Sequence, residues 1–234
     1  MSKGTLYLIP NSLGGNVQQV TGPLTKEVVQ TIDHYVIEEI RSARRFLRAI
    51  GYEKDFEEVS FQLLNEHTKD QDFKAFLQPA LAGKNMGVIS EAGVPCVADP
   101  GASVVRAAHA LGIRVVPLVG ASSILLTLIA SGLNGQSFAF NGYLPKERGE
   151  RVRRLKTLEA QALKFGQTQL FMDAPYRNDQ VMEDMVKNLG PQTMICVASD
   201  ITLDGERITT MSTADWSKHI PKLHKRLVMF AIGS

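Results

Sequence analysis

The feature of the sequence that most restricts its fold is an alternation of short β-branched or aromatic runs with longer stretches delimited by turn residues. In the first half, such runs predict strands at 5–9, 35–37, 59–63, 86–89 and 115–118. The stretches between them predict helices at 25–31, 41–50, 72–82 and 103–111. Strands and helices in this order form a mostly parallel sheet covered by helices on both faces. The first half is therefore expected to be an α/β domain.

The second half repeats this alternation with one difference. After a helix expected at 122–131, the apolar runs predict strands at 137–140, 168–172, 194–198, 207–210 and 227–232. The dipeptide Asp204-Gly205 lies between two extended stretches, a pattern that favours a turn and an antiparallel strand pair. The second half is therefore expected to be an α/β lobe with a mixed sheet.

The length of the chain favours two domains. Its 234 residues exceed the usual domain size of roughly 100 to 150 residues. A predicted strand ends in the Pro- and Gly-containing segment 117–120, just before a long helix. We therefore expect an N-terminal domain at 1–117 and a C-terminal domain at 118–234.

The composition indicates an ordinary globular protein, with 44% apolar and 21% charged residues. The segment 124–130 is far shorter than the ~20 apolar residues that span a bilayer, and the apolar run at 5–9 is too short for a signal peptide. A cytoplasmic protein with no membrane association is therefore expected. Cys96 and Cys196 lie in apolar runs and are interpreted as buried free thiols, and the five histidines lack the spacing of a metal motif, so no metal is expected.

Three common nucleotide-binding or catalytic motifs are excluded, because the sequence lacks a glycine that each of them requires. The loop after the first strand, which contains Gly14, does not follow the G-x-G-x-x-G pattern of dinucleotide sites. Lys84 lacks the upstream glycine of a phosphate-binding P-loop, and Ile124 replaces the closing glycine of a hydrolase nucleophile elbow. Ser122 or Ser123 is better explained as a cap of the following helix.

The segment Ser90-Glu91-Ala92-Gly93-Val94-Pro95-Cys96-Val97-Ala98-Asp99-Pro100-Gly101, called here the glycine loop, is the most informative motif. It begins where a predicted strand ends, and open α/β sheets bind ligands at the carboxyl ends of their strands. Its glycines and prolines shape a tight loop whose main-chain groups can face a ligand. By spacing alone, a simple surface turn is the more common explanation of such a segment.

The glycine loop resembles the S-D-A-G-T-P-x-x-S-D-P-G signature of the ribosomal RNA ribose methyltransferases within the tetrapyrrole methylase superfamily. Further segments resemble other motifs of that family: E-D-T-R-H-T-R at 38–44, part of H-E-H-N at 65–67, V-V-P-L-P-G-x-x-x at 115–123, S-A-S-G-L at 130–133 and F-x-F-x-G-F-L-P at 138–145. The resemblance therefore extends over essentially the whole chain.

This resemblance implies two α/β lobes around a cleft that holds S-adenosylmethionine, and pairing of two chains in a homodimer. It also implies methyl transfer to a ribose 2′-hydroxyl of ribosomal RNA. Carried over by position, the expected cofactor contacts are Pro10, Glu91, Ala92, Gly93, Val94, Ser123, Ile124, Met172, Ala198 and Lys225.

A ribose hydroxyl needs a base or a polarising group before it attacks a methyl carbon. Glu38 and Glu66 each follow a predicted strand and are the candidate catalytic carboxylates, although a solvated ion-pair role is an open alternative for both. His67 is a substitute base and a candidate substrate contact.

Two basic clusters give local support to an RNA substrate, although the net charge is only +2. Arg41 and Arg44, the candidate RNA contacts, share a helix with two further arginines, and all four are expected to face outward. The second cluster contains Lys146, Arg148, Arg151, Arg153, Arg154 and Lys156. Basic helix faces are also common on solvated surfaces, and this alternative stays open.

Departures from the family pattern concern the acceptor more than the cofactor. The first loop, usually T-P-I-G-N-L, reads Ile9-Pro10-Asn11-Ser12-Leu13-Gly14, Ile40 replaces a threonine, and 174–177 replaces S-T-H-R. Two alternatives to an RNA methyltransferase therefore remain. One is a methyltransferase for a small molecule such as a tetrapyrrole, and the other is a non-catalytic module that binds S-adenosylmethionine.

Overall fold

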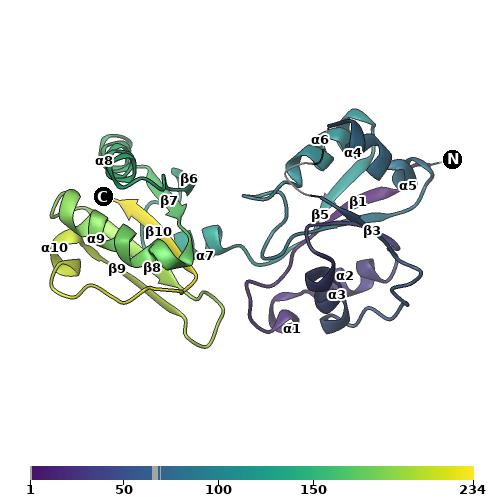
Figure 1. Ribbon diagram of the computed structural model, residues 1–234, viewed down its shortest axis with the longest axis horizontal. Helices are drawn as coiled ribbons and strands as arrows, with labels where there is room; N and C mark the ends of the chain where they lie inside the picture. Colours follow the sequence, from purple (N-terminus) through teal and green to yellow (C-terminus); the bar gives the residue numbers. More distant parts are fainter. Residues whose placement is uncertain (1, 65–67, 69) are drawn as a thin grey trace. The chain divides into compact units, whose positions relative to one another are not determined.

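The computed structural model describes residues 2–64, 68 and 70–234, and the chain divides into two compact units (Figure 1). The first unit is Met1–Ser122 and the second is Ser123–Ser234. The division follows the segment 117–120, in which the sequence suggested a junction. Each unit has its own five-stranded sheet.

A mostly parallel sheet was predicted for the first unit, and the sheet there is entirely parallel. Its strands are β1 (Thr5–Ile9), β2 (His34–Ile37), β3 (Ser60–Leu63), β4 (Met86–Ile89) and β5 (Arg114–Pro117). They lie in the order β3-β2-β4-β1-β5. The central strand β4 is buried at every position, which matches the continuous apolar character expected for a strand covered on both faces.

Two hydrophobic clusters cover the two faces of this sheet. Tyr35 of β2 belongs to a cluster with Phe46, whereas the next residue, Val36, belongs to a cluster with Phe73 and Val104. Successive side chains of a strand point to opposite faces, so the clusters lie on opposite sides.

The helices of the first unit are α1 (Val17–Val20), α2 (Pro23–Val29), α3 (Ile40–Ala49), α4 (Asp70–Phe76), α5 (Gln78–Leu81) and α6 (Ala102–Ala110). Helices α2 and α3 cover one face and α4 to α6 the other (Figure 1). The single helix expected at 72–82 is two helices separated at Leu77, because Pro79 lies in the first turn of α5.

The sheet of the second unit is mixed, as predicted. Its strands are β6 (Phe138–Tyr143), β7 (Thr168–Met172), β8 (Met194–Ser199), β9 (Arg207–Ser212) and β10 (Val228–Gly233), in the order β6-β7-β10-β8-β9. Strands β6 and β7 are parallel, and the other neighbouring pairs are antiparallel. The expected antiparallel pair around Asp204-Gly205 is β8 and β9, joined by residues 200–206 rather than by a two-residue turn.

The helical segments of the second unit are α7 (Ser123–Ser131), α8 (Arg148–Phe165), η1 (Pro175–Arg177), α9 (Asn178–Asn188) and α10 (Thr213–Trp216). Leu155 and Leu158 of α8 pack with Met182 of α9 and Phe230 of β10 in one buried cluster. Among the described residues, no helix combines the length and the apolar character needed to cross a bilayer.

Candidate functional site

The glycine loop lies at the carboxyl edge of the parallel sheet, beside the loops that follow β1 and β2. Ile89, the last residue of β4, pairs with Ile9 on one side and Ile37 on the other. The residues that follow these three strand ends are Pro10, Glu38 and Ser90, so parallel pairing brings them to the same edge. The structure therefore groups the predicted residues Pro10, Glu38, Glu91, Ala92, Gly93 and Val94.

Main-chain hydrogen bonds join the loop after β1 to the glycine loop. The amide of Asn11 donates to the carbonyl of Gly93 at 2.8 Å, and the amide of Gly93 donates to the carbonyl of Ser12 at 3.2 Å. Gly93 has φ +69°, and a Cβ atom there would lie 3.1 Å from Leu13 Cδ2. The loop therefore needs glycine at this position.

The segment before the second unit closes one side of this arrangement. Pro10 is buried, and any side chain at Gly120 would collide with its ring. The carbonyl oxygen of Ala121 lies 3.3 Å from the position that a Cβ atom at Gly93 would take. The loop after β1 is thus packed between the glycine loop and residues 120–121.

Two carboxyl groups of the glycine loop, those of Glu91 and Asp99, lie near the carboxyl group of Glu38. The pKa of Glu38 is raised to about 7, chiefly by partial burial and then by the negative charges of Asp99 and Glu91, while a hydrogen bond from the Glu91 backbone opposes the rise. Burial, with the charge of Glu91, also raises the pKa of Asp99. Glu38 therefore exchanges its proton near neutral pH, as a general base must.

A narrow pocket adjoins Glu38 at the ends of β2 and β4. Glu38 and Asp99 line it together with Val36, Ile37, Leu64, Val88, Ile89, Ser90, Pro95, Cys96 and Gly101. Burial and the neighbouring Asp99 raise the pKa of the Cys96 thiol to about 11, so this free cysteine is a neutral thiol at neutral pH. Cys96 is half-buried and Cys196 fully buried, close to the expectation for both.

The other candidate base, Glu66, and the candidate substrate contact His67 lie outside the described residues.

Helix α3 begins beside the pocket and carries the predicted arginines. The Glu39 side chain caps it by accepting hydrogen bonds from the amides of Arg41 and Ser42 at 2.8 and 2.6 Å. These bonds are the main reason that the pKa of Glu39 lies below its usual value, and the charges of Arg41 and Arg45 add to the effect. Arg41, Arg44, Arg45 and Arg48 are all exposed, as expected.

Two of these arginines also pack against aromatic rings, which the sequence analysis did not anticipate. The Arg44 guanidinium lies 5.3 and 5.4 Å from the ring centres of Phe56 and Phe61. Arg48 lies 4.1 Å from the Phe56 ring centre and donates to the carbonyl of Tyr52 at 2.6 Å. These cation–π contacts give Arg44 and Arg48 a structural role besides their charge.

In the second unit, Met172 and Ala198 lie on either side of Met229 in the strand register. Lys225 is exposed, has φ +63°, and donates its amide to the carbonyl of Pro175 at 2.9 Å. The structure therefore groups three predicted cofactor contacts at one edge of the second sheet. The remaining two, Ser123 and Ile124, form the first turn of α7 and are half-buried.

Sequence reasoning missed a buried ion pair at this edge. Arg177 binds the carboxylate of Asp173 through both Nη2 and Nε, the latter at 2.8 Å, and Ala174 donates its amide to the same oxygen. The departure from the family pattern in this segment did not point to the pair, because Arg177 matches the arginine of S-T-H-R.

A family model for the tetrapyrrole (corrin/porphyrin) methylases matches residues 24–216. The chain belongs to this family. It is therefore a methyltransferase by family, and the resemblance inferred from the glycine loop is confirmed.

Curated relatives of this tetrapyrrole methylase family member bear the name ribosomal RNA small subunit methyltransferase I. The protein from Escherichia coli O157:H7 is 31% identical over 88% of this chain and 68% of its own length. That from Bacillus subtilis is 32% identical over 85% and 64%, and that from Pseudomonas aeruginosa is 29% identical over 92% and 74%. The crystal structure of the methyltransferase CobJ shares the fold, with a TM-score of 0.65 at 16% identity over 99% of this chain and 94% of CobJ.

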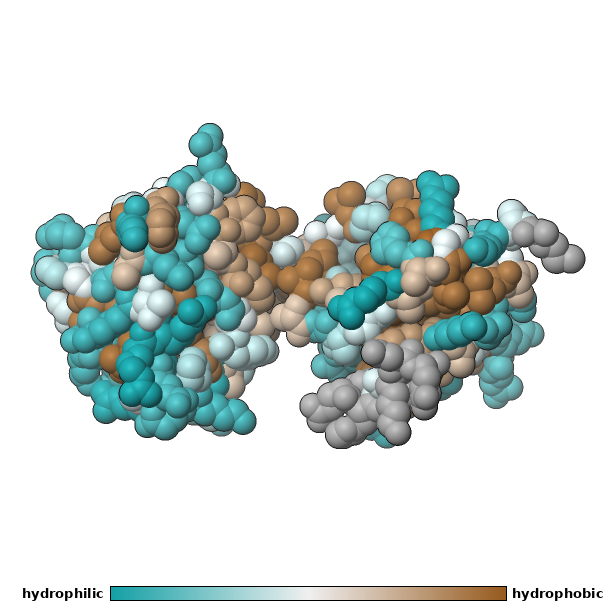
Figure 2. All heavy atoms as spheres, turned by 90° about the horizontal axis from the view of Figure 1, so that it is seen from above, coloured by the Kyte–Doolittle hydropathy of each residue, from teal (hydrophilic) through white to brown (hydrophobic). Residues whose placement is uncertain are grey.

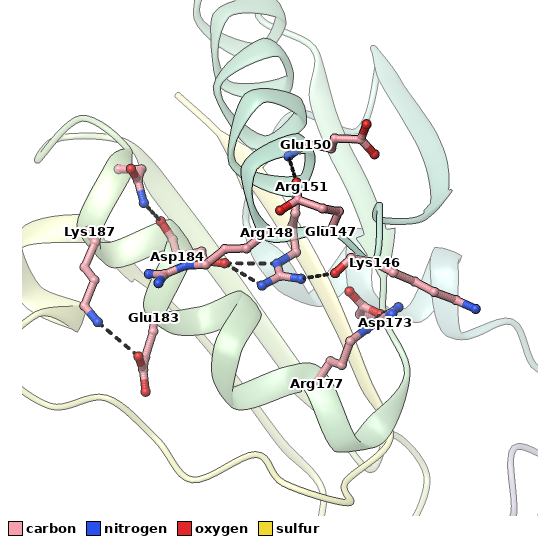
Figure 3. Close-up of polar contacts among 11 residues, drawn as sticks. Lys146, Glu147, Arg148, Glu150, Arg151, Asp173, Arg177, Glu183, Asp184 and Lys187 are labelled. Carbon is pink, nitrogen blue, oxygen red and sulfur yellow. Dashed lines mark hydrogen bonds and ion pairs between the residues drawn. The ribbon is translucent and has the colours of Figure 1, made fainter.

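The second basic cluster of this methylase corrects a prediction. Arg151 is only 2% exposed and binds Asp184 Oδ2 through Nε and Nη2 at 3.0 and 2.8 Å (Figure 3). Arg148 binds the other oxygen of Asp184 at 2.9 Å, and Arg154 donates to Asn141 at 2.8 Å. The interpretation of Arg151 as part of a basic cluster that supports RNA binding is wrong, because its charge is enclosed and paired inside the second unit.

Proposed function

We propose that this protein is an S-adenosylmethionine-dependent methyltransferase that methylates a ribose 2′-hydroxyl of small-subunit ribosomal RNA. The observation that carries the proposal is the grouping of the glycine loop with Glu38, a carboxyl of pKa about 7, at one edge of the parallel sheet. Family membership and the names of the curated relatives support the reaction and the substrate class.

The residues proposed to hold the cofactor fit its chemistry. Pro10 and the residues 91–94 offer a tight, glycine-shaped backbone surface, whereas Met172 and Ala198 offer an apolar one. Ser123, Ile124 and Lys225 complete the proposed contacts. When bound, S-adenosylmethionine supplies a methyl group on a sulfonium, which is an activated leaving group.

Glu38 is the proposed general base. At neutral pH about half of its carboxyl groups are ionised, so it can accept the proton of a hydroxyl acceptor and hold it after transfer. The adjoining pocket is narrow and mostly apolar, which limits access of water. Glu66 and His67 remain proposed as a second acid–base group and a substrate contact.

Arg41 and Arg44 are the proposed RNA contacts, because both are exposed on α3, whose first turn follows Glu38 and Glu39. Phosphate neutralisation by such arginines supplies affinity without reading sequence.

A transfer assay with matched variants tests this function. Titration calorimetry measures binding of S-adenosylmethionine, and transfer of tritium from its labelled methyl group measures methylation of small-subunit ribosomal RNA. The Arg41→Ala, Arg44→Ala double variant should lose RNA transfer and retain cofactor affinity. Cofactor binding without transfer to any RNA refutes the RNA assignment.

One observation favours a second candidate acceptor. The burial of Arg151 removes a charge from the basic surface expected for RNA, so the argument for RNA from charge rests more heavily on α3. A methyltransferase for a small molecule would transfer tritium to a cell extract freed of RNA. A non-catalytic binding module would transfer none to either.

We also propose that the protein is a cytoplasmic homodimer. Figure 2 shows hydrophobic residues gathered along one side of the visible face of the second unit. Helix α7 exposes the apolar side chains of Leu125 and Ile129. Strand β6, at the edge of the second sheet, exposes Phe138 and Tyr143. Light scattering during size-exclusion chromatography gives the mass of the particle, and a monomer at micromolar concentration contradicts the pairing.

A further inference from the structure

Asn11 makes an unusual set of contacts in the loop after β1. The residue is buried, with only 6% of its surface exposed. The Nδ2 group donates to the carbonyl oxygens of Ser90 and Glu91 at 3.1 and 3.0 Å, and Oδ1 accepts the amide of Ser12 at 2.8 Å. The donor and acceptor capacity of this amide is therefore used to tie two loops together.

The family pattern has isoleucine at this position, which offers no such bonds. An asparagine buried beside main-chain carbonyl groups costs free energy unless those groups pair with it. Here the carbonyl groups of Ser90 and Glu91 both accept hydrogen bonds from it, so the burial of this amide is compensated.

The other carbonyl groups at the start of the glycine loop also accept hydrogen bonds. The Ser90 hydroxyl donates to the carbonyls of Ala92 and Gly93 at 3.3 and 3.2 Å, and the amide of Asn11 also donates to Gly93. The carbonyl oxygens of residues 90–93 therefore all accept hydrogen bonds from the two loops. The amides of Glu91 and Gly93 are engaged as well, with Glu38 and with the Ser12 carbonyl, so what this loop offers to a ligand is chiefly its shape.

We infer that Asn11 is a positioning residue that holds the carbonyl groups of Ser90 and Glu91 inward and so fixes the glycine loop in the conformation that receives the cofactor. This inference rests on the proposed function, since the ligand is the S-adenosylmethionine proposed above. It assigns Asn11 no contact with the cofactor and no part in proton transfer.

Two variants separate the parts of this role. Asn11→Ala removes every side-chain bond, whereas Asn11→Asp has nearly the same shape and can still accept the Ser12 amide but cannot donate to the two carbonyls at neutral pH. The control is Asn134→Ala in the second unit, because Asn134 also donates to a backbone carbonyl, that of Gly166 at 2.6 Å, and accepts the amide of Gln136 at 2.9 Å.

The first measurement needs no ligand. Hydrogen exchange of the Gly93 amide, which donates to Ser12, should be at least about tenfold faster in both Asn11 variants and unchanged in Asn134→Ala. Unchanged exchange in Asn11→Ala overturns the inference, because the loop would then hold its shape without the side chain.

The second measurement is calorimetric affinity for S-adenosylmethionine, with the KM for RNA and the unfolding temperature as companions. Both Asn11 variants should bind about tenfold or more weakly, the loss expected for two hydrogen bonds, while the KM for RNA stays unchanged. A merely structural role would lower the unfolding temperature and leave cofactor affinity alone, and that result overturns the inference.

The failures are distinguishable. Wild-type affinity in Asn11→Asp would show that only the Ser12 contact matters, which overturns the inference and leaves the proposed function intact. A wild-type protein that binds no S-adenosylmethionine refutes both, and normal Gly93 protection in that protein would show that the loop itself is formed.

Discussion

Replacement of Glu38 by glutamine should have opposite effects on activity and on stability. Glutamine keeps the shape of the side chain but cannot accept a proton. If Glu38 is the general base, Glu38→Gln should lower kcat by roughly 10² to 10⁴-fold, the usual contribution of general base catalysis. Cofactor affinity should change little, because Glu38 is not among the proposed cofactor contacts.

The pKa of about 7 fixes the shape of the pH profile. The ionised fraction of such a group rises from about a tenth at pH 6 to about nine tenths at pH 8, so kcat/KM of the wild type should rise by roughly tenfold over this interval. Asp99→Asn removes a negative charge that raises the pKa of Glu38, and the midpoint of the profile should move to lower pH.

The same pKa gives the sign of the stability effect. A carboxyl group in the unfolded chain ionises near its ordinary value of 4.5, whereas in the folded protein Glu38 keeps its proton up to about 7. The folded state therefore loses stability as the pH rises between these values. Glu38→Gln avoids this loss, so its unfolding temperature should exceed that of the wild type at pH 8 and approach it at pH 4.5.

Activity assays between pH 6 and 8 and thermal unfolding at pH 4.5 and 8 check both parts. A flat pH profile together with full activity of Glu38→Gln would refute the assignment of the base. An unfolding temperature that falls in Glu38→Gln at pH 8 would refute the claim that ionisation of Glu38 opposes folding.

Three further predictions concern stability and RNA binding. Arg151→Met should destabilise the second unit by about 3–5 kcal/mol in chemical denaturation, because it leaves the Asp184 charge buried with less compensation, and a loss below 1 kcal/mol would contradict this. Arg41→Gln should reduce the salt slope of RNA affinity by about one, the value for one lost phosphate contact, and leave the stability of the fold unchanged. Arg44→Gln should reduce the slope in the same way and also lose about 0.5–1 kcal/mol of stability, because its aromatic contacts are lost. Equal unfolding temperatures for these two variants would count against the stacking role. Gly120→Ala should lower the unfolding temperature, since its methyl group collides with the Pro10 ring, and an unchanged temperature would show that the loop after β1 adapts.

The parallel sheet could be predicted because each of its strands is a short apolar run between helical segments. Parallel pairing then fixes which residues meet, since the strand ends at Ile9, Ile37 and Ile89 lie in one register row. For this reason, the grouping of Pro10, Glu38 and the glycine loop followed from topology alone. Hydrogen bonds between loops, such as that from the Asn11 side chain to the Ser90 carbonyl, could not be predicted, because they depend on loop dihedral angles that a strand pattern does not contain.

The charge pattern was sufficient to predict exposed arginines on α3 but not on α8. On α3, the buried residues Ala43 and Leu47 lie four apart, and the arginines fall on the other face, as the periodicity requires. On α8, the buried row is Arg151, Leu155, Leu158 and Ala162, so the same periodicity places Arg151 on the apolar face.

The basic cluster on α8 was interpreted from its composition rather than from this row. An arginine on an apolar face requires a buried partner, and here that partner is Asp184, on a different helix and 33 residues away in the sequence. The local sequence does not identify this partner, but an arginine on an apolar helix face does indicate that a buried partner is needed. Because Arg151 is thereby excluded as a phosphate ligand, the charge-based case for RNA rests chiefly on α3, where Arg44 and Arg48 also pack against the rings of Phe56 and Phe61. The decisive comparison is therefore between single arginine variants of that one helix.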